Sequence, residues 1–488
     1  MKRLLMACAL MLATASAAFA QIGGGSITGT VQDDQGGVLP GASVTLAGSD
    51  RTTSSITDEA GKFRFLNLAP GTYKVTAALQ GFSTVVREGL EVRVGANVDV
   101  PFSLKVATVE ETITVTGESP LVDTRATGTS TNFTQAELEK VPTSRDPWAL
   151  LRTVPGVLVD RVNIGGNETG QQSNFQSKGT RPQDAVWTLD GVVITDMAAV
   201  GASPTYFNFD NFEEIQVATA GQDIKQPTGG VGLNFVVKRG TNNFRGMFRG
   251  FFTNDSLESE NVPDELAATV TPEQADHNDQ ISDVGFELGG PIWRDKAWFY
   301  GSYSHQDVRL VRRSGNLIDR TVLKNPNVKL NWQATHSDMI SFLFFNGDKI
   351  KNGRSPGVSG INFDAPTATW DQGNAYTDFK LHGLWKLEDN HTFGSKFFMT
   401  SRYAYYNTGF TLAPIGGMDQ TSGRSFILGR SFGSVSRSLN VRPQHTVNLD
   451  GTAFQQWFGA SHDIKMGFGW RRADGLRAPS TVPDRDRS

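Results

Sequence analysis

Residues 328–334 read Val-Lys-Leu-Asn-Trp-Gln-Ala, and the period of this stretch decides the fold class. Val328, Leu330 and Trp332 alternate with polar residues. Successive strand residues point to opposite sides, so an extended chain here has one apolar and one polar face. The same alternation recurs at 244–252, 379–387 and 464–471. These segments predict β-strands, although a soluble β-sandwich would show the same period.

The connections between the alternating segments favour a membrane barrel. Short turns are predicted at 293–296, 334–338, 387–391 and 459–462, and long polar links at 253–280, 310–326, 347–374 and 409–442. Short links at one end and long links at the other are typical of an outer-membrane barrel, whose outer face meets lipid and whose lumen is wet. Trp and Tyr residues near the strand ends suit the two membrane interfaces.

The number of predicted strands is small for such a barrel. We count about nine strands between residues 244 and 471, whereas large outer-membrane barrels run to roughly 22 and bacterial barrels close with even numbers. An open sheet in lipid leaves backbone N–H and C=O groups without partners. Residues 478–488 are polar and contain proline, and they predict no terminal strand. The sequence therefore predicts a partial antiparallel transmembrane β-barrel, a truncated copy of a larger one.

The N-terminus has the pattern of a secretory signal. Lys2 and Arg3 precede an apolar stretch that runs to about Ala18, and small residues at Ala18 and Ala20 predict cleavage before Gln21. After that point, no apolar run approaches the roughly 18 residues that a spanning helix needs. The mature chain is therefore expected to be exported, and to meet any membrane as strands.

Composition excludes several classes of function. The single cysteine, Cys8, lies inside the signal, so the mature chain has no thiol for catalysis, disulfides or metal sites. Removal of Lys2 and Arg3 takes the formal net charge from −4 to −6. A mildly acidic chain has no broad basic field for nucleic acid, and no nucleic-acid partner is expected.

Two smaller units precede the barrel segments. Short strand-like pieces at 26–31, 42–47, 62–65, 72–78, 91–94 and 97–104 are separated by Gly, Pro and Asp turns and predict an all-β sandwich. Residues 121–240 predict a small α+β unit. In it, Thr134 and Glu137 have capping-box spacing, and Asp146 followed by Pro147 predicts a second short helix. Strands are predicted there at 185–189, 192–195, 215–218 and 231–238.

Residues 110–117, Glu-Glu-Thr-Ile-Thr-Val-Thr-Gly, lie between these two units. The β-branched run favours an extended chain, and Gly117 and Pro120 prevent its continuation. Such a segment can lend its backbone to the free edge of another protein's sheet, or it can be the last strand of the preceding domain. The eight residues by themselves leave these two interpretations about equal.

Longer motifs carry a resemblance to a known family. Around Pro40-Gly41 and within 57–63 and 68–73, the first unit resembles the carboxypeptidase regulatory-like module, a non-catalytic β-sandwich. Some proteins of that shape bind carbohydrate, which is a fold analogy alone. The α+β unit resembles the plug domain of TonB-dependent outer-membrane receptors. The motifs that carry this resemblance are Gly179-Thr180-Arg181, Leu189-Asp190-Gly191-Val192, 212–217, 229–240 and Asn243-Phe244-Arg245-Gly246.

The resemblance, strengthened by 289–292 and 295–300, identifies an Oar-like receptor with the regulatory-like module in front of plug and barrel. It implies five segments: a signal peptide at 1–20, the sandwich at 21–104, a linker at 105–120, the plug at 121–240 and an incomplete barrel at 241–488. It also implies that the linker holds the TonB box, which favours the strand-donor interpretation. The implied TonB-binding residues are Glu111, Thr112, Ile113, Thr114, Val115, Thr116 and Gly117.

The function implied by the resemblance is energy-coupled uptake of a substrate too large for porins. The implied partners are TonB with its inner-membrane energising proteins, outer-membrane lipid, and a substrate such as an iron chelate, vitamin B12, an oligosaccharide or a peptide. The implied location is the outer membrane of a Gram-negative-type bacterium, with the N-terminal domain in the periplasm. No cofactor, metal or catalytic residue is expected, and the substrate-binding residues are not identified.

Two other classes of function remain as alternatives. An exported adhesion or carbohydrate-binding protein would use all the β regions as soluble modules. A hydrolase is indicated only by 429–433, which match G-x-S-x-G around Ser431 but lie in a Gly/Ser-rich link without the required strand and helix. The seven histidines never lie within five positions of one another, so the sequence predicts no local zinc pair.

Overall fold

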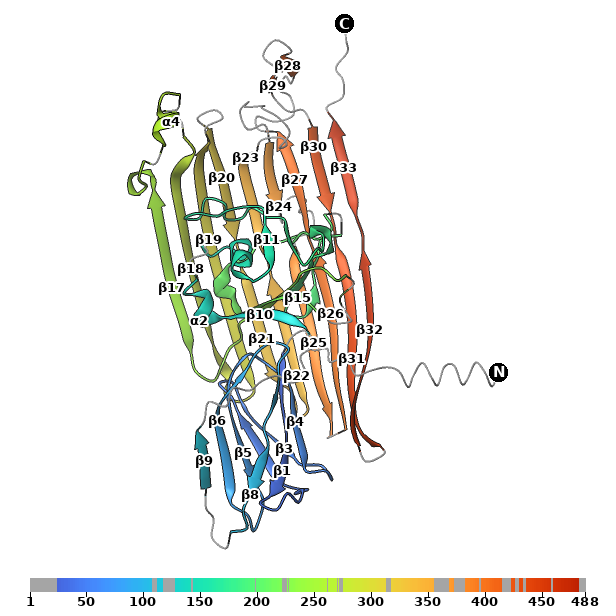
Figure 1. The fold of residues 1–488 in the computed structure, drawn as a ribbon. Coiled ribbons are helices and arrows are strands. Elements are labelled where there is room, and N and C mark those ends of the chain that lie inside the picture. The colour runs from blue at the N-terminus through green and yellow to red at the C-terminus, as the bar shows by residue number, and fades with distance from the viewer. Residues whose placement is uncertain are drawn as a thin grey trace, which may run out of the picture.

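The computed structural model has three parts, which Figure 1 shows as a small β domain below a tall curved sheet, with a compact mixed unit against the inner face of that sheet. The described residues are 24–107, 112–116, 128–141, 144–197, 199–221, 226, 228–260, 262–269, 271, 275–312, 317–354, 368–372, 382–394, 396–414, 423–425, 430–432, 436–457 and 460–481. The predicted signal peptide lies outside them. The mainly β class is confirmed.

The N-terminal domain, called the sandwich below, consists of two sheets. The first pairs β1 (Gly25–Asp33) with β4 (Lys62–Leu68), β7 (Asn97–Asp99) and β8 (Phe102–Leu104). The second has the order β3 (Thr52–Ile56), β2 (Ser43–Ala47), β5 (Gly71–Ala78), β6 (Thr84–Val92) and β9 (Thr112–Thr116). Ile27, Phe63 and Val75 fill the core between them. The sequence prediction missed β3, because its polar Thr and Ser residues give no apolar alternation, and it began β6 too late.

The mixed unit, which comprises the described residues from 128 to 240, is built around a sheet with the order β10-β15-β16-β13-β14. Its elements are β10 (Thr129–Thr134), α2 (Gln135–Leu138), α3 (Pro147–Leu150), η1 (Leu151–Thr153), β11 (Val157–Val159), β12 (Phe175–Ser177), η2 (Pro182–Asp184), β13 (Val186–Leu189), β14 (Val192–Val193), η3 (Phe209–Asn211), β15 (Phe212–Ala220) and β16 (Gly232–Val237). Both predicted helix starts are confirmed. Thr134 and Glu137 form the capping box, and the Asp146 side chain accepts a hydrogen bond from the Trp148 N–H at 3.2 Å.

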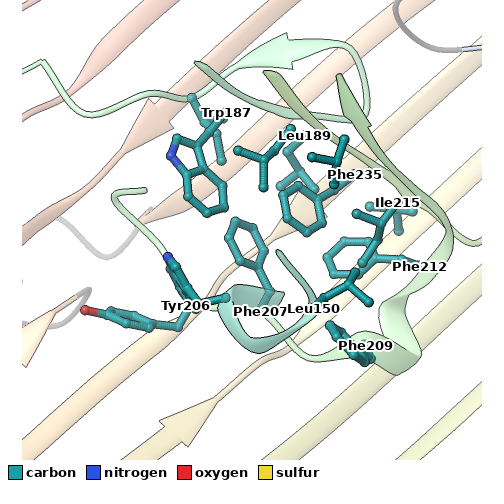
Figure 2. Close-up of a cluster of buried hydrophobic side chains, with 14 of the residues drawn as sticks. Leu150, Trp187, Leu189, Tyr206, Phe207, Phe209, Phe212, Ile215 and Phe235 are labelled. Atoms are coloured by element: carbon teal, nitrogen blue, oxygen red, sulfur yellow. The ribbon is translucent and has the colours of Figure 1, made fainter. Parts of the chain in front are cut away.

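An aromatic core holds the mixed unit together (Figure 2). The rings of Phe207 and Phe235 stack with centroids 4.5 Å apart, and Trp187 stacks on Phe235 at 5.8 Å. All three side chains are buried. Stacked aromatic pairs add stabilisation beyond the area that they bury. The cluster also includes residues of the large sheet such as Phe345 and Leu384, so the unit and that sheet share one core.

The large sheet, called the barrel wall below, is antiparallel and contains fifteen strand segments. The first three strands are unbroken: β17 (Arg245–Asn254), β18 (His277–Trp293) and β19 (Ala297–Arg312). The next six are each made of two segments: β20/β21 (Leu317–Lys324, Asn327–Gln333), β22/β23 (Asp338–Phe345, Asp348–Arg354), β25/β24 (Gly383–Phe393, Ala368–Gln372), β26/β27 (Phe397–Asn407, Gly409–Pro414), β31/β30 (Gln444–Trp457, Ser436–Val441) and β32/β33 (Ala460–Ala473, Leu476–Thr481). The described residues therefore form nine successive strands, the number that the alternation predicted. The strands are longer than predicted, because β20, β23, β24, β27 and β30 lie in stretches predicted as long links and β33 extends into the tail predicted to hold no strand.

The two faces of the wall differ as the period predicted. On β21, Lys329 and Asn331 are buried on the inner face, whereas Leu330 and Trp332 point outward and are 37% and 50% exposed. Two predicted turns, at 387–391 and 459–462, are wrong. Residues 460–462 belong to β32 and pair with β31. β25 pairs with β22 as far as His391 and extends to Phe393, so residues 387–391 lie within a strand.

The remaining described elements lie at the long-loop end of the wall. They are η4 (Asp255–Leu257), α4 (Asp264–Ala267), β28 (Gly423–Ser425) and β29 (Arg430–Phe432). The opposite end carries the short turns between β18 and β19, β21 and β22, and β25 and β26, and the sandwich lies there (Figure 1). No helix in the described part of the chain is both long and apolar enough to cross a membrane.

Candidate functional site

The turn between β13 and β14 brings the mixed unit against the barrel wall. Asp190 and Gly191 both have left-handed backbone conformations, with φ of 48° and 80°. Asp tolerates this conformation better than most residues, and Gly adopts it freely. A Cβ on Gly191 would also lie 2.7 Å from the Arg402 guanidinium. The Asp-Gly pair therefore permits a tight turn that approaches the wall closely.

The Asp190 carboxylate forms two ion pairs with the wall. The Nζ atoms of Lys329 on β21 and Lys386 on β25 lie 2.8 Å and 2.6 Å from its two oxygens. All three side chains are buried. Burial by itself would raise the pKa of Asp190, but the two ammonium groups outweigh it and hold this pKa well below its ordinary value. Asp190 is therefore ionised and joins two wall strands to the mixed unit.

Neighbouring charges extend this contact along the wall. Arg402 on β26 donates to the Gly191 carbonyl at 2.7 Å and to the Glu388 carboxylate at 2.6 Å. Lys386 also donates to the Asp190 carbonyl at 3.0 Å. The wall thus binds the turn through its side chain and its backbone together.

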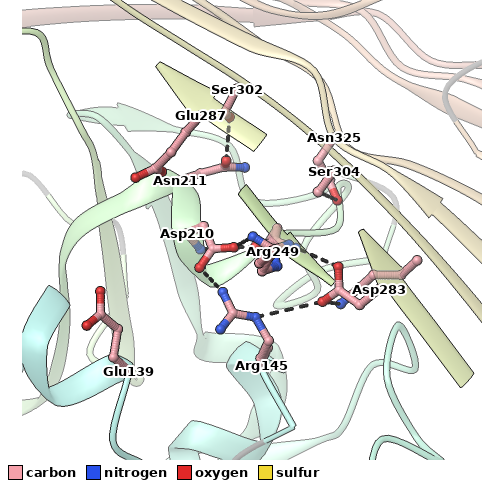
Figure 3. Close-up of polar contacts among 12 residues, drawn as sticks. Glu139, Arg145, Asp210, Asn211, Arg249, Asp283, Glu287, Ser302, Ser304 and Asn325 are labelled. Carbon is pink, nitrogen blue, oxygen red and sulfur yellow. Dashed lines mark hydrogen bonds and ion pairs between the residues drawn. The ribbon is translucent and has the colours of Figure 1, made fainter. Parts of the chain in front are cut away.

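A second ionic cluster fixes the other side of the mixed unit (Figure 3). Asp210 in η3 pairs with both Arg145, which precedes α3, and Arg249 on β17. Arg249 also pairs with Asp283 on β18 at 3.0 Å. Close by, Lys238 pairs with Glu287 of β18 at 2.9 Å. Apolar packing accompanies these ion pairs, because the core of the mixed unit continues into the wall, where Phe345 of β22 lies with its ring centroid 6.0 Å from that of Phe207.

The sandwich contacts the mixed unit through a third polar group of residues. Arg239, just after β16, pairs with Asp50 at 3.0 Å and donates to the Tyr73 hydroxyl at 3.3 Å. Burial raises the pKa of Tyr73 to about 12. Tyr73 is therefore a neutral hydroxyl that accepts from Arg239 and donates to the Ala69 carbonyl at 2.8 Å.

Glu214 of β15 makes the second contact with the sandwich. Its carboxylate oxygens accept from the Val94 N–H at 3.0 and 3.2 Å, and Asn132 also donates to it. Gln216 donates to the Val94 carbonyl at 3.1 Å. Burial raises the pKa of Glu214 to about 7, although the hydrogen bonds from Val94 and Asn132 act in the opposite direction.

A chamber of about 740 Å³ lies between the sandwich, the mixed unit and the wall. Charged side chains from all three parts line it: Arg51 and Arg64 from the sandwich, Glu213 and Arg239 from the mixed unit, and Lys329 and Glu388 from the wall. Arg51 also hydrogen-bonds Gln333 at the end of β21. The short-turn end of the lumen is therefore polar and partly covered by the sandwich.

The predicted TonB-binding segment lies in the sandwich. Thr112 to Thr116 form β9, which pairs in parallel with β6 from Thr84 to Glu88. Glu111 and Gly117 lie outside the described residues. Of the two interpretations that the sequence left open, β9 has the position expected of a last strand of the preceding domain, and it is also an edge strand that another strand can join.

The structure does not support the hydrolase alternative. Ser431 lies inside β29, which pairs with β28, with Ser431 opposite Arg424. A nucleophile elbow would place it on a sharp turn between a strand and a helix. One cluster that sequence spacing missed is Asp338, Asp389 and His391, whose side chains come within metal-ligand reach of one another. His391 already hydrogen-bonds Asp338, and that contact explains the pair without an ion.

Three family models match successive parts of the chain. They are the carboxypeptidase regulatory-like domain at 26–105, the TonB-dependent receptor plug domain at 123–232 and an outer membrane beta barrel domain at 236–324. Among curated proteins, the TonB-dependent transporter Oar of Myxococcus xanthus is 26% identical over 310 residues. That match covers 60% of this chain and 28% of Oar.

Solved structures share the fold at low identity. FpvA of Pseudomonas aeruginosa, bound to pyoverdines, matches with a TM-score of 0.54 at 11% identity over 75% of this chain and 45% of FpvA. The ferric enterobactin receptor PfeA of the same organism matches with a TM-score of 0.50 at 12% identity over 72% of this chain and 50% of PfeA. The chain thus spans about half the length of these structures or less, and 28% of Oar.

The Asp190→Asn variant tests the contact between the mixed unit and the wall. It leaves Lys329 buried without its counter-charge and Lys386 with only Glu388, 3.4 Å away, and breaking such buried pairs costs about 3–5 kcal/mol. We expect faster amide hydrogen exchange in β13 and β14, measured by mass spectrometry on the detergent-purified chain. Asp184→Asn is the matched control, because Asp184 pairs with Arg181 at the surface of the same unit. Equal effects of the two variants would contradict the anchoring role of Asp190.

The Glu214 contact predicts a pH dependence of sandwich docking. Burial raises the pKa of Glu214 from 4.5 to about 7, so the docked state holds the proton more tightly than a state in which Glu214 meets water. The docking contribution is fully present below the lower value and is lost as the pH rises through the higher one. Distances between spin labels on sandwich and wall should therefore broaden across this window. The Glu214→Gln variant should show no such trend, and a trend that persists in it would assign the effect to another group.

Proposed function

Since the chain belongs to the TonB-dependent receptors that carry a carboxypeptidase regulatory-like domain in front of the plug and barrel domains, we propose that it acts in energy-coupled uptake across the outer membrane. Members of this family are transporters, not enzymes. The observation that carries the proposal is the mixed unit on the inner face of the partial barrel, fixed to that wall by buried ion pairs. A plug held in this way blocks the lumen until its contacts change.

The short-turn end of the barrel is proposed to face the periplasm. Outer-membrane barrels have short periplasmic turns and longer outer loops. The sandwich and β9 lie at the short-turn end (Figure 1), which is where a periplasmic energising protein would act. The chamber beneath the plug would then be the exit side of the pathway, and the long loops the entry side.

Residues 111–117 are proposed to bind TonB. β9 is extended, and its five residues have no charged side chain, glycine or proline. Strand addition relies on backbone groups, so such a segment can transmit a pull whatever its side chains are. A pull on the chain just ahead of the plug would strain the contacts of Asp190 and Asp210 with the wall.

Further strands are proposed to complete the barrel. In the described part of the chain, β17 and the β32/β33 strand form the two edges of the large sheet. Each unpaired backbone group in lipid costs several kcal/mol, so a spanning sheet requires both edges to be paired. The substrate is proposed to exceed the porin limit. The pyoverdine and enterobactin receptors resemble this chain in fold alone, so their ligands do not define its substrate.

The lipid-facing side of the barrel predicts the effect of a buried charge. Phe286 on β18 is 55% exposed and packs on Tyr303 of β19 with ring centroids 6.1 Å apart. An Arg on the lipid face of a spanning strand costs about 2–4 kcal/mol near the bilayer midplane. Phe286→Arg should therefore reduce the amount of folded chain in outer-membrane fractions, whereas Phe286→Leu should not. Unchanged yield, with the chain in the soluble fraction, would support the alternative of an exported soluble β protein.

A pull-down with the periplasmic domain of TonB tests the proposed coupling. Replacing 111–117 by a Gly-Ser segment of equal length should weaken binding at least tenfold, because the extended backbone partner is lost. The same replacement at 120–126 is the matched control, and it should leave binding intact. Equal binding by the two variants would place the TonB contact elsewhere in the chain.

A further inference from the structure

We propose that the sandwich presents the coupling segment as the edge strand of its own sheet, so that TonB adds a sixth strand beside β9 instead of capturing a free peptide. The proposal rests on the proposed function and goes further, because it makes the regulatory-like domain part of the coupling machinery. The interaction surface is the outer backbone edge of β9, and the partner is an extended strand of the periplasmic TonB domain.

The position of β9 is set by its pairing with β6. The register is continuous from Thr84↔Thr112 to Glu88↔Thr116, so every described residue of the segment has a partner in the sandwich. In the sheet order β3-β2-β5-β6-β9, the strand lies at one end. One side of its backbone is thus occupied by β6, and in the described part of the chain no strand pairs with the other side.

The opposite edge of the same sheet faces the barrel wall. β3 lines the chamber against the barrel wall, and Arg51, which directly precedes β3, hydrogen-bonds Gln333 of β21. An incoming strand at β3 would therefore have to enter the chamber beside the barrel wall, whereas β9 lies on the outer side of the sandwich (Figure 1). The geometry leaves β9 as the edge of this sheet that a periplasmic partner can reach.

The composition of β9 is that of an edge strand that can pair with a strand of another protein. Natural proteins protect exposed edge strands with charged residues, proline or bulges, because unpaired backbone groups recruit other strands. The edge strand β4 in the other sheet follows this rule with Lys62 and Arg64. β9 reads Thr-Ile-Thr-Val-Thr and has none of these devices, and its pairing with β6 is without a bulge.

The sandwich is also connected to the plug, which gives a path for force. Val94, two residues beyond the end of β6, is bound by Glu214 and Gln216 of plug strand β15. Arg239, after plug strand β16, binds Asp50 and Tyr73 of the sandwich. A pull on β9 while it is paired with β6 therefore reaches the plug through these contacts as well as through the connecting chain.

A disulfide lock between β6 and β9 tests the proposal in the full-length, detergent-purified chain. Val86 and Thr114 are backbone partners, and neighbouring strands have the Cα spacing that a disulfide accepts. The mature chain has no cysteine if the signal is removed, so the double variant Val86→Cys with Thr114→Cys contains the only two thiols. The single variant Thr114→Cys is the matched control, and affinity for the periplasmic TonB domain is measured before and after reduction.

If TonB adds to the docked strand, the locked chain should bind it within about threefold of the reduced chain. Loss of binding of tenfold or more on oxidation, with recovery on reduction, would overturn the proposal and leave the coupling function intact. Failure of the two thiols to join would contradict the pairing itself. If the unmodified chain does not bind TonB, the proposed function fails first. Self-association of the locked chain through β9 would overturn the proposal in favour of a second copy as the occupant.

Discussion

Two ammonium groups on the inner wall of the barrel, those of Lys329 and Lys386, require a buried counter-charge, and Asp190 of the plug supplies it. A single buried cation is too costly to leave unpaired, so these three side chains fix where the plug lies against the wall. This contact requires the tight Asp190-Gly191 turn, because a side chain at Gly191 would come too close to the Arg402 guanidinium. The position of the plug in the lumen thus depends on one turn and on residues from three wall strands.

The plug is held to the wall by two kinds of contact. Inside the plug, Phe207, Phe235 and Trp187 form a stacked apolar core that water does not replace. Between plug and wall, ion pairs lie beside apolar contacts, and Phe345 of β22 packs on Phe207 and Phe212 of the plug with ring centroids 6.0 and 6.2 Å apart. The plug is therefore held to the wall by apolar packing as well as by ion pairs.

The sandwich is attached to the plug by polar contacts. Its contacts with the plug use Asp50, Tyr73 and the backbone of Val94, against Arg239 and Glu214. The sandwich covers the polar chamber at the short-turn end with its β3 edge, and this arrangement leaves β9 at the outer edge of the same sheet. The covering of the lumen and the outer position of β9 are thus two results of one docking geometry.

The sequence by itself determined the features that depend on neighbouring residues. Alternation placed Leu330 and Trp332 on the outer face and Lys329 and Asn331 on the inner face, and Thr134 and Asp146 marked the helix starts. The polar strand β3 was missed, because without apolar residues it has no period to detect. Only the tertiary structure decided which charges meet. Asp190 is 139 residues from Lys329 and 196 from Lys386, and no local pattern encodes that pairing. The same holds for β9, whose residues specify an extended chain, while its place beside β6 depends on how the sandwich closes.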